Sequence, residues 1–337
     1  MITKKITSTN VAVIGGGSWG TAIVKILSEN DTKIKWWLRD ADTVNFIKHF
    51  QHNPKYLSDV QLNMRKVKVD TNVKKVVQGA DYVILAVPAA FLKEAIKPLT
   101  SEDFKGRIVV SAIKGIIPGQ THLITDYLER HYYLPDDDLC VIGGPCHSEE
   151  VALEKQSYLT IGCKDFNTGI QFSNLMTCRY VKCNAITDIY GIEYCAIMKN
   201  IISILSGITH GLGYGDNFQA VLISNAMQEV KRFLEVAHPM ANRDLFGSAY
   251  LGDLLVTSYS QFSRNRMFGN MIGRGYSVKA AQVEMNMIAE GYYAVKCMVD
   301  IVKRYDIDMP ILKAVYHILY EKVSPAVEIT ILKNLLK

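Results

Sequence analysis

Short apolar runs alternate with amphipathic helical patterns through the first half of the chain. In the first helical pattern, apolar residues recur at i, i+3, i+4, i+7 and i+8, as Trp19, Ala22, Ile23, Ile26 and Leu27. Two further helical patterns cover Phe91–Ile96 and Thr121–Arg130. The predicted strands are Val11–Ile14, Ile34–Leu38, Val67–Val69, Tyr82–Val87, Ile108–Ile113, Leu139–Ile142, Leu159–Cys163 and Tyr180–Cys183. Because near-continuous apolar strands alternate with helices, the pattern predicts an α/β domain with a doubly wound parallel sheet.

The pattern changes at about residue 188. From Gly191 to the C-terminus we find helical periodicity, interrupted at Gly and Pro residues, and no convincing strand. The segment Ile192–Leu205 is apolar over most of its circumference, which predicts a buried central helix. We therefore expect an α/β domain over residues 1–188 and an all-α domain over residues 189–337.

Length and charge agree with two ordinary globular domains. The chain has 337 residues, which is more than a typical single domain and suits two. Its formal charge of +5 is mild, and its lysines and arginines are interspersed with acids. This excludes the basic, aromatic-rich surface typical of nucleic-acid binding. A small positive surplus does suit a site for anionic phosphates.

The cysteines and the hydropathy pattern bear on the compartment. The seven cysteines are odd in number and none lies in C-x-x-C spacing. Neither a zinc site nor a disulfide framework is expected, and reduced thiols in the cytoplasm are the better interpretation. The polar start Met1–Lys5 does not fit a signal peptide. No unbroken run of about 18 apolar residues occurs, so we expect no membrane span.

A glycine-rich turn follows the first predicted strand. Residues Gly15 to Gly20 read G-G-G-S-W-G, which satisfies G-x-G-x-x-G between a strand and a helix. Gly15 would make the tight turn, Gly17 would let a pyrophosphate approach the backbone, and Gly20 would let helix and strand pack closely. The helix N-terminus, with Ser18 and Trp19, would add N–H donors. The motif predicts a Rossmann-type dinucleotide-binding domain over residues 1–188.

The tip of the second predicted strand bears on the choice of nucleotide. It reads Leu38-Arg39-Asp40. An acid at this position binds the ribose hydroxyls of NAD, whereas an arginine pairs with the 2′-phosphate of NADP. Arg39 favours NADP, although it would also fit a solvated loop. An inward-facing Asp40 would instead restore the NAD-type contact, so the expected cofactor is NADP or NAD, with NADPH slightly favoured.

Several further motifs occur in one order along the chain. In the first domain they are Ser18–Thr21 after the glycines, Asn53 with Tyr56-Leu57, Lys114–Ile116 and Gly144-Pro145. In the second they are Gly191–Asn200, Gly211–Asn217, Gly252–Thr257 and Ser263–Arg266 with Gly269. This set resembles the signature of the bacterial type of NAD(P)-dependent glycerol-3-phosphate dehydrogenases. The resemblance runs from about residue 11 to about residue 293.

The resemblance implies the catalytic residues. Lys199 lies partway along a largely apolar helix, where a lone lysine usually snorkels to solvent. Burial and a nearby cation would instead lower its pKa toward that of a general acid. The family assigns Lys199 this acid/base role and places Lys114 beside it, against substrate and cofactor. Asn200 would hold the lysine or the substrate. Asp253 would orient a lysine or bind a substrate hydroxyl, with Thr257 on the same helical face, although Asp253 would also suit a helix N-cap.

The resemblance also implies the ligand contacts. Ser263, Arg264 and Asn265 would clamp the substrate phosphate just before a helical segment, since arginine binds phosphate through charge-assisted bonds. A solvated basic turn is the alternative for this segment. Arg264 would also touch the cofactor, as would Ile288 and Glu290.

The chain departs from the family at one segment. Gly144 would line the substrate, but Cys146-His147-Ser148 stands where the bacterial family usually has S-F-A. Cys146 would face the substrate and Ser148 the cofactor, so these contacts are altered. His147 is not expected to be catalytic, because Lys199 fills that role.

The resemblance implies reversible NAD(P)H-dependent reduction of dihydroxyacetone phosphate to sn-glycerol 3-phosphate. It also implies that the enzyme is a cytoplasmic homodimer and that its product supplies glycerophospholipid biosynthesis. A two-domain hydroxy-acid reductase would share the glycine turn and a lysine but would bind a carboxylate. A non-catalytic NAD(P)-sensing protein would keep only the glycine turn. The Lys199, Asp253 and Arg264 set favours the dehydrogenase.

Overall fold

A computed structural model describes residues 8–285 and 289–337, and the chain divides into two compact units. The sheet unit holds the chain up to Ile113, with Thr125–Ile142 and Cys146–Ile189. The helical unit holds Tyr190–Lys337 together with two segments of the first half, Lys114–Ile124 and Gly143–Pro145. Lys114 and Gly144 therefore belong to the same unit as Lys199.

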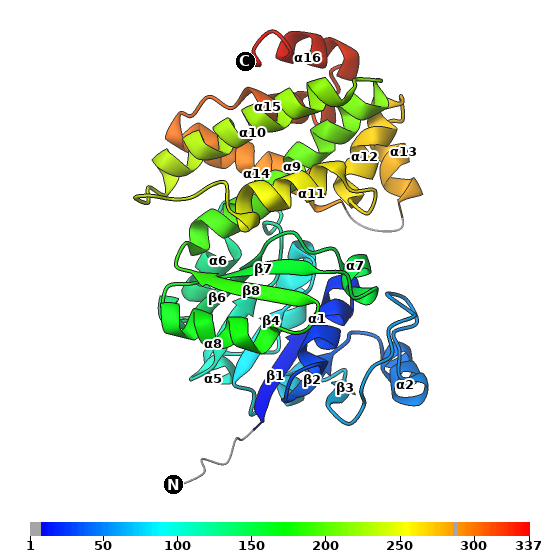
Figure 1. Ribbon diagram of the computed structural model, residues 1–337, viewed down its shortest axis with the longest axis vertical. Helices are drawn as coiled ribbons and strands as arrows, with labels where there is room; N and C mark the ends of the chain where they lie inside the picture. Colours follow the sequence, from blue (N-terminus) through cyan, green and yellow to red (C-terminus); the bar gives the residue numbers. More distant parts are fainter. Residues whose placement is uncertain (1–7, 286–288) are drawn as a thin grey trace. The chain divides into compact units, whose positions relative to one another are not determined.

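The sheet unit contains eight strands in the order β3-β2-β1-β4-β5-β6-β7-β8 (Figure 1). The pairs β1–β2, β2–β3, β1–β4, β4–β5, β5–β6 and β7–β8 are parallel. The strands are β1 Thr9–Ile14, β2 Thr32–Trp37, β3 Val67–Asp70, β4 Tyr82–Leu85, β5 Ile108–Ser111, β6 Leu139–Gly143, β7 Ser157–Cys163 and β8 Val181–Ile186. Every predicted strand is present, and the order β3-β2-β1-β4-β5-β6 is that of a Rossmann sheet.

Helices connect these strands and cover the sheet. They are α1 Ser18–Ser28, α2 Ala41–Phe50, α3 Val73–Val77, α4 Leu92–Ile96, α5 Ser101–Phe104, α6 Ile124–Tyr132, α7 Ser148–Ala152 and α8 Phe166–Met176, with short 3₁₀ turns at Ala89–Phe91 and Asp136–Asp138. The stripe predicted on α1 is buried at Ala22, Ile23, Ile26 and Leu27, which form one core with residues such as Trp36 of β2. The predicted helical patterns after β4 and β5 correspond to α4 and α6.

The helical unit has no strand among its described residues, as the sequence predicts. Its helices are α9 Ile189–Gly211, α10 Asp216–Ala237, α11 Asp253–Tyr259, α12 Arg264–Gly273, α13 Val278–Glu284, α14 Glu290–Tyr305, α15 Pro310–Leu319 and α16 Pro325–Leu332. A π-helical turn, Ser248–Gly252, leads into α11. α9 is long and apolar enough to cross a membrane, but its apolar window is wholly buried inside the protein. It thus has the burial of a core helix.

α9 and α12 pack with their backbones in contact through glycines. A Cβ atom on Gly207 of α9 would lie 2.0 Å from the carbonyl oxygen of Arg266. A Cβ atom on Gly269 of α12 would lie 1.9 Å from the carbonyl oxygen of Ile204. Only glycine permits so close an approach. The packing fixes the first turn of α12 beside Gly207, about two turns after Lys199 on α9.

Candidate active site

The glycine turn has the backbone geometry that its motif predicts. Gly15 has φ +133°, and a Cβ there would lie 2.5 Å from the carbonyl oxygen of Ala86. A Cβ on Gly20 would lie 2.1 Å from the carbonyl oxygen of Gly15. Gly17, the N-cap of α1, has nothing within 4 Å of the same position. The turn is therefore closed on the protein side and open at Gly17, which suits a pyrophosphate at the start of α1.

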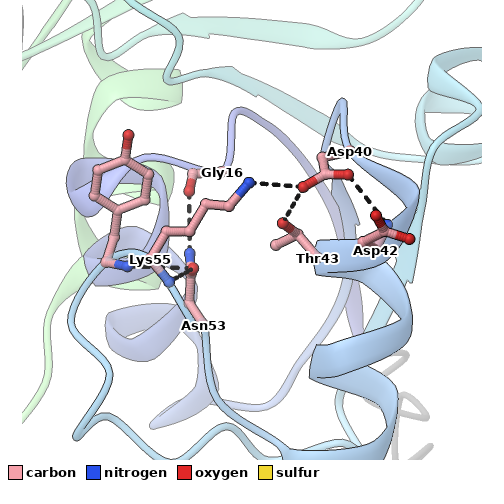
Figure 2. Close-up of polar contacts among 7 residues, drawn as sticks. Gly16, Asp40, Asp42, Thr43, Asn53 and Lys55 are labelled. Carbon is pink, nitrogen blue, oxygen red and sulfur yellow. Dashed lines mark hydrogen bonds and ion pairs between the residues drawn. The ribbon is translucent and has the colours of Figure 1, made fainter.

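Asn53 ties the loop after α2 to this turn (Figure 2). Its side chain is fully buried, and its Nδ2 donates to the carbonyl oxygen of Gly16 at 3.0 Å and to the Thr21 hydroxyl at 2.9 Å. Its Oδ1 accepts from the backbone N–H of Lys55 and of Tyr56. Two of the four bonds reach the glycine turn and the start of α1, and two stay within the loop of Asn53, so this side chain joins the loop to the turn and is engaged at both ends of its amide.

The carboxylate of Asp40 is committed to protein contacts (Figure 2). It caps α2 by accepting from the N–H of Asp42, and it accepts from the Thr43 hydroxyl at 2.6 Å and the Lys55 ammonium at 2.7 Å. The bond from Lys55 is the main reason that the pKa of the Asp40 carboxyl lies far below its usual range. Arg39 is exposed, with its guanidinium 6.0 Å from the centroid of the Phe91 ring. Of the two residues, Arg39 is the one left to meet a ligand.

Lys199 and Asp253 form a buried ion pair within the helical unit. The Lys199 Nζ lies 2.5 Å from Asp253 Oδ1, and their side chains are 6% and 2% exposed. Lys199 does not snorkel to solvent, and the N-cap of α11 is Gly252, so neither of the alternative interpretations describes these two residues. The π-helical turn ends directly before Asp253, and such turns are frequent at functional sites.

The surroundings of Lys199 tune its acidity. Burial lowers the pKa of the Lys199 ammonium to about 8. The Asp253 carboxylate opposes this change, and the Lys114 ammonium acts in the same direction as burial. An amine whose pKa lies near neutrality can both give and take a proton at physiological pH.

The neighbours of the ion pair hold it in place and leave one acceptor open. The Asn200 amide donates to the carbonyl oxygen of Lys114 at 2.6 Å, which holds the Lys114 segment against α9. The Thr257 hydroxyl lies 3.4 Å from Asp253 Oδ1. Asp253 Oδ2 is buried and has no hydrogen-bond partner among residues 8–285 and 289–337. A buried carboxylate oxygen without a donor is costly, and a hydroxyl or N–H group of a bound ligand would satisfy it.

The predicted phosphate clamp lies at the start of α12. Ser263 is its N-cap and accepts from the N–H of Arg266. The Ser263 hydroxyl also bonds to the Ser203 hydroxyl at 2.9 Å, and Ser203 donates to the carbonyl oxygen of Thr257. These bonds occupy the Ser263 hydroxyl. Arg264 is half-buried, and the Asn265 side chain is buried.

The remaining predicted residues fall in three places. Gly144 has φ +107° and lies in the helical unit, whereas Cys146 and Ser148 are buried in the sheet unit. Glu290 is the half-buried first residue of α14. Ile288 lies outside the described residues.

Two residues that contact the predicted site residues were not predicted from the sequence. Ser203 stands one turn after Lys199 on an apolar helix, and this spacing was a signal that it shares the lysine's face. Lys55 stands in an ordinary polar loop, so nothing in the local pattern placed it beside Asp40.

Comparisons with known proteins agree with this architecture. Residues 10–168 match the model of the NAD-dependent glycerol-3-phosphate dehydrogenase N-terminus, and residues 188–330 match that of the C-terminus. The glycerol-3-phosphate dehydrogenase [NAD(P)+] of Bacillus subtilis is 34% identical over 94% of this chain and 92% of its own length. That of an Exiguobacterium species is 35% identical over 95% and 94%. A crystal structure of glycerol-3-phosphate dehydrogenase from Coxiella burnetii superposes with a TM-score of 0.89, at 26% identity, covering 96% of this chain and 98% of that one. The chain belongs to the NAD-dependent glycerol-3-phosphate dehydrogenase family.

Proposed function

We propose that this protein reduces dihydroxyacetone phosphate to sn-glycerol 3-phosphate, reversibly, with NAD(P)H. The observation that carries the proposal is the buried Lys199–Asp253 pair, which has an open acceptor at Asp253 Oδ2. A bound nicotinamide would supply the hydride that the substrate carbonyl carbon accepts. Lys199, as an ammonium, gives its proton to the developing alkoxide, and in the reverse direction the neutral amine removes that proton. Asp253 keeps the ammonium oriented and accepts from a substrate hydroxyl.

The start of α12 provides the phosphate site in this proposal. Arg264 contributes a guanidinium, which binds a phosphate through two parallel bonds, and the first turn of α12 adds the favourable end of the helix dipole. Because its own contacts occupy the Ser263 hydroxyl, we assign Ser263 to the architecture of the clamp. Asn265 contributes its amide Nδ2.

The residues of the sheet unit fit a dinucleotide. The turn at Gly15, Gly17 and Gly20 is a backbone cradle, because a Cβ on Gly15 or Gly20 would collide with a backbone carbonyl oxygen while the space at Gly17 stays open. Gly17 and Ser18 would meet the pyrophosphate at the start of α1, with Trp19 beside them. In the helical unit, Lys114 and Glu290 would hold the nicotinamide half, and Arg264 would touch both ligands.

The test of the activity is the oxidation of NADPH, followed by its absorbance, with three kinds of carbonyl substrate. We expect turnover with dihydroxyacetone phosphate, very little with unphosphorylated dihydroxyacetone, and none with 2-keto acids. Turnover of 2-keto acids at a rate equal to that of dihydroxyacetone phosphate would identify a hydroxy-acid reductase. Nucleotide binding with no turnover of any of the three would identify a sensor.

For the nucleotide, we propose a preference for NADPH that Arg39 determines. The Asp40 carboxylate is held by Lys55 and Thr43, so it is not free to bind a ribose diol. Arg39→Ala should lower kcat/KM for NADPH about ten-fold, with little change for NADH. Arg65→Ala is the matched control, because the exposed Arg65 precedes β3, whereas Arg39 follows the parallel strand β2, so Arg65 lies at the opposite end of the strands and should change neither value. A wild type that prefers NADH, or equal losses for both nucleotides, would contradict this role.

We further expect a cytoplasmic homodimer that supplies glycerol phosphate for glycerophospholipids. This expectation comes from the family. Sedimentation equilibrium measures the oligomeric state directly, and a monomer at micromolar concentration would contradict it.

A further inference from the structure

The first turn of α14 is capped by a side chain from another helix. The N-cap residue of α14 is Ala289, which has no side chain able to accept a hydrogen bond. Asn265 of α12 takes this place, because its Oδ1 accepts from the backbone N–H of Gly291 at 3.0 Å. Gly291 is the second residue of the helix, whose N–H is one of those that an N-cap side chain ordinarily satisfies. The cap thus comes from 26 positions earlier in the chain.

A second contact fixes the same turn from the side. A Cβ atom on Gly291 would lie 2.6 Å from the carbonyl oxygen of Asn200, so the backbones of α14 and α9 touch there. Asn200 is the neighbour of Lys199, and its own amide holds the backbone of Lys114. The side chain of Asn265 and the backbone of Asn200 therefore contact Gly291 from two directions. These two contacts fix the backbone directly after Glu290.

The Asn265 amide has one end in use and one end available. Its Oδ1 is occupied by Gly291, while its Nδ2 makes no hydrogen bond to another residue of the described chain. The side chain is 7% exposed, so the bond to Gly291 is shielded from water. An amide bound at one end and open at the other can hold a helix and donate to a ligand at the same time.

We propose that Asn265 is a positioning residue for the nucleotide as well as a donor to the substrate. By capping α14 it holds Glu290 where that side chain contacts the cofactor, so a residue of the phosphate clamp also sets the affinity for NAD(P)H. This inference rests on the proposed function through the role of Glu290. It predicts that substitutions of Asn265 can separate the effect of its Oδ1 on nucleotide binding from the effect of its Nδ2 on substrate binding.

The experiment compares Asn265→Ala with Asn265→Asp. The aspartate keeps an acceptor for the Gly291 N–H but loses the Nδ2 donor and brings a negative charge toward the substrate phosphate. We expect Asn265→Ala to raise the Kd for NADPH about five-fold in the absence of substrate, since loss of a helix cap is typically worth that much. Asn265→Asp should leave this Kd within about two-fold of wild type. Both variants should raise KM for dihydroxyacetone phosphate.

Two further measurements separate this role from general destabilisation. Hydrogen exchange at the Gly291 amide of the unliganded protein should be faster in Asn265→Ala and unchanged in Asn265→Asp. Adding Asn265→Ala to Glu290→Ala should weaken NADPH binding no more than Glu290→Ala alone, because the cap acts through the glutamate. Ser277→Ala, which removes the side-chain cap of α13, is the matched control and should leave the Kd unchanged.

Several results would overturn the inference. One is a Kd for NADPH in Asn265→Ala equal to that of wild type, and another is a Kd raised as much in Asn265→Asp as in Asn265→Ala. The others are additive losses of NADPH affinity in the double variant and an unchanged Kd in Glu290→Ala. Should Asn265→Ala fail to fold, Asn265→Leu, which has a similar volume and no acceptor, takes its place. A wild type that binds NADPH but does not reduce dihydroxyacetone phosphate would refute the proposed function. Hydrogen exchange at Gly291 and the Kd values of the variants would still show whether Asn265 caps α14 and affects NADPH binding.

Discussion

The pKa of Lys199 should move in opposite directions when its two charged neighbours are neutralised. Reduction of the substrate requires the ammonium form, so the wild-type kcat for reduction should fall as the pH rises through about 8. Asp253→Asn removes the opposing negative charge and leaves burial and Lys114 to lower the pKa further. Lys114→Met removes a like charge and should raise the pKa of Lys199.

The structure sets the size of these changes. An opposite charge within about 4–6 Å shifts a pKa by roughly 1–3 units, and Asp253 Oδ1 lies 2.5 Å from the Lys199 Nζ. The pKa of Lys199 in Asp253→Asn should therefore lie at about 5–7. At pH 7 the protonated fraction would fall from about nine-tenths to between about one-half and one-hundredth. For Lys114→Met we expect a rise of roughly one unit.

The assay is kcat for dihydroxyacetone phosphate reduction, at saturating substrates, over a pH range of about 6 to 10. Lys199→Ala should lose about 10²–10⁴-fold in kcat while still binding NADPH, and should lose the pH dependence near 8. Lys279→Met, an exposed lysine of α13, is the matched control and should keep the wild-type profile. Activity of Lys199→Ala within about three-fold of wild type, or shifts of the same sign in Asp253→Asn and Lys114→Met, would refute the reasoning.

Three other predictions concern binding and stability. Arg264→Ala should raise KM for dihydroxyacetone phosphate by roughly ten-fold or more, through loss of a charge-assisted bond, and an unchanged KM would remove Arg264 from the clamp. Gly269→Ala should lower the free energy of unfolding by about 1–3 kcal/mol or more, because its Cβ would meet the backbone of Ile204, whereas Gly215→Ala has open space and should be tolerated in a urea titration. Burial raises the pKa of Glu229 to about 7, so the folded state binds the extra proton between about pH 4.5 and 7 and stability should fall as the pH rises through that window. Glu229→Gln should flatten this dependence, and an unchanged slope would show that Glu229 does not cause it.

Strands were predictable from the sequence where they are buried. β1 and β4 are buried almost throughout, and their apolar runs are unbroken. The predicted ends were less accurate. The apolar run Tyr82–Val87 extends two residues beyond β4, which ends at Leu85. Ala86 and Val87 stay buried after the strand has ended, and Ala86 packs on Gly15. β8 extends past Cys183 to Ile186, where partly exposed residues do not form an apolar run.

The orientation of Asp40 was open in the sequence but was not without a signal. Asp40 and Thr43 are spaced as an N-cap residue and its hydroxyl partner at the start of a helix. That local pattern indicates a carboxylate turned toward α2. The bond from Lys55 depends on the path of the whole loop, and Asn265 reaches Gly291 across 26 positions, so neither contact has a local pattern.

The spacing of polar residues along α9 was a further signal in the sequence. Lys199, Ser203 and Ser206 follow each other at i, i+4 and i+7 on a largely apolar helix, whose other buried polar residues include Glu193, Asn200 and Thr209. Each bonds to α11, through Asp253, the carbonyl oxygen of Thr257 and that of Ser258 respectively. A buried hydroxyl or ammonium is stable only beside a partner. Polar residues at helical spacing on an apolar helix therefore identify the face that meets another polar backbone or side chain. On α9 this face carries Lys199, so the stripe indicates the face on which the proposed acid/base group lies.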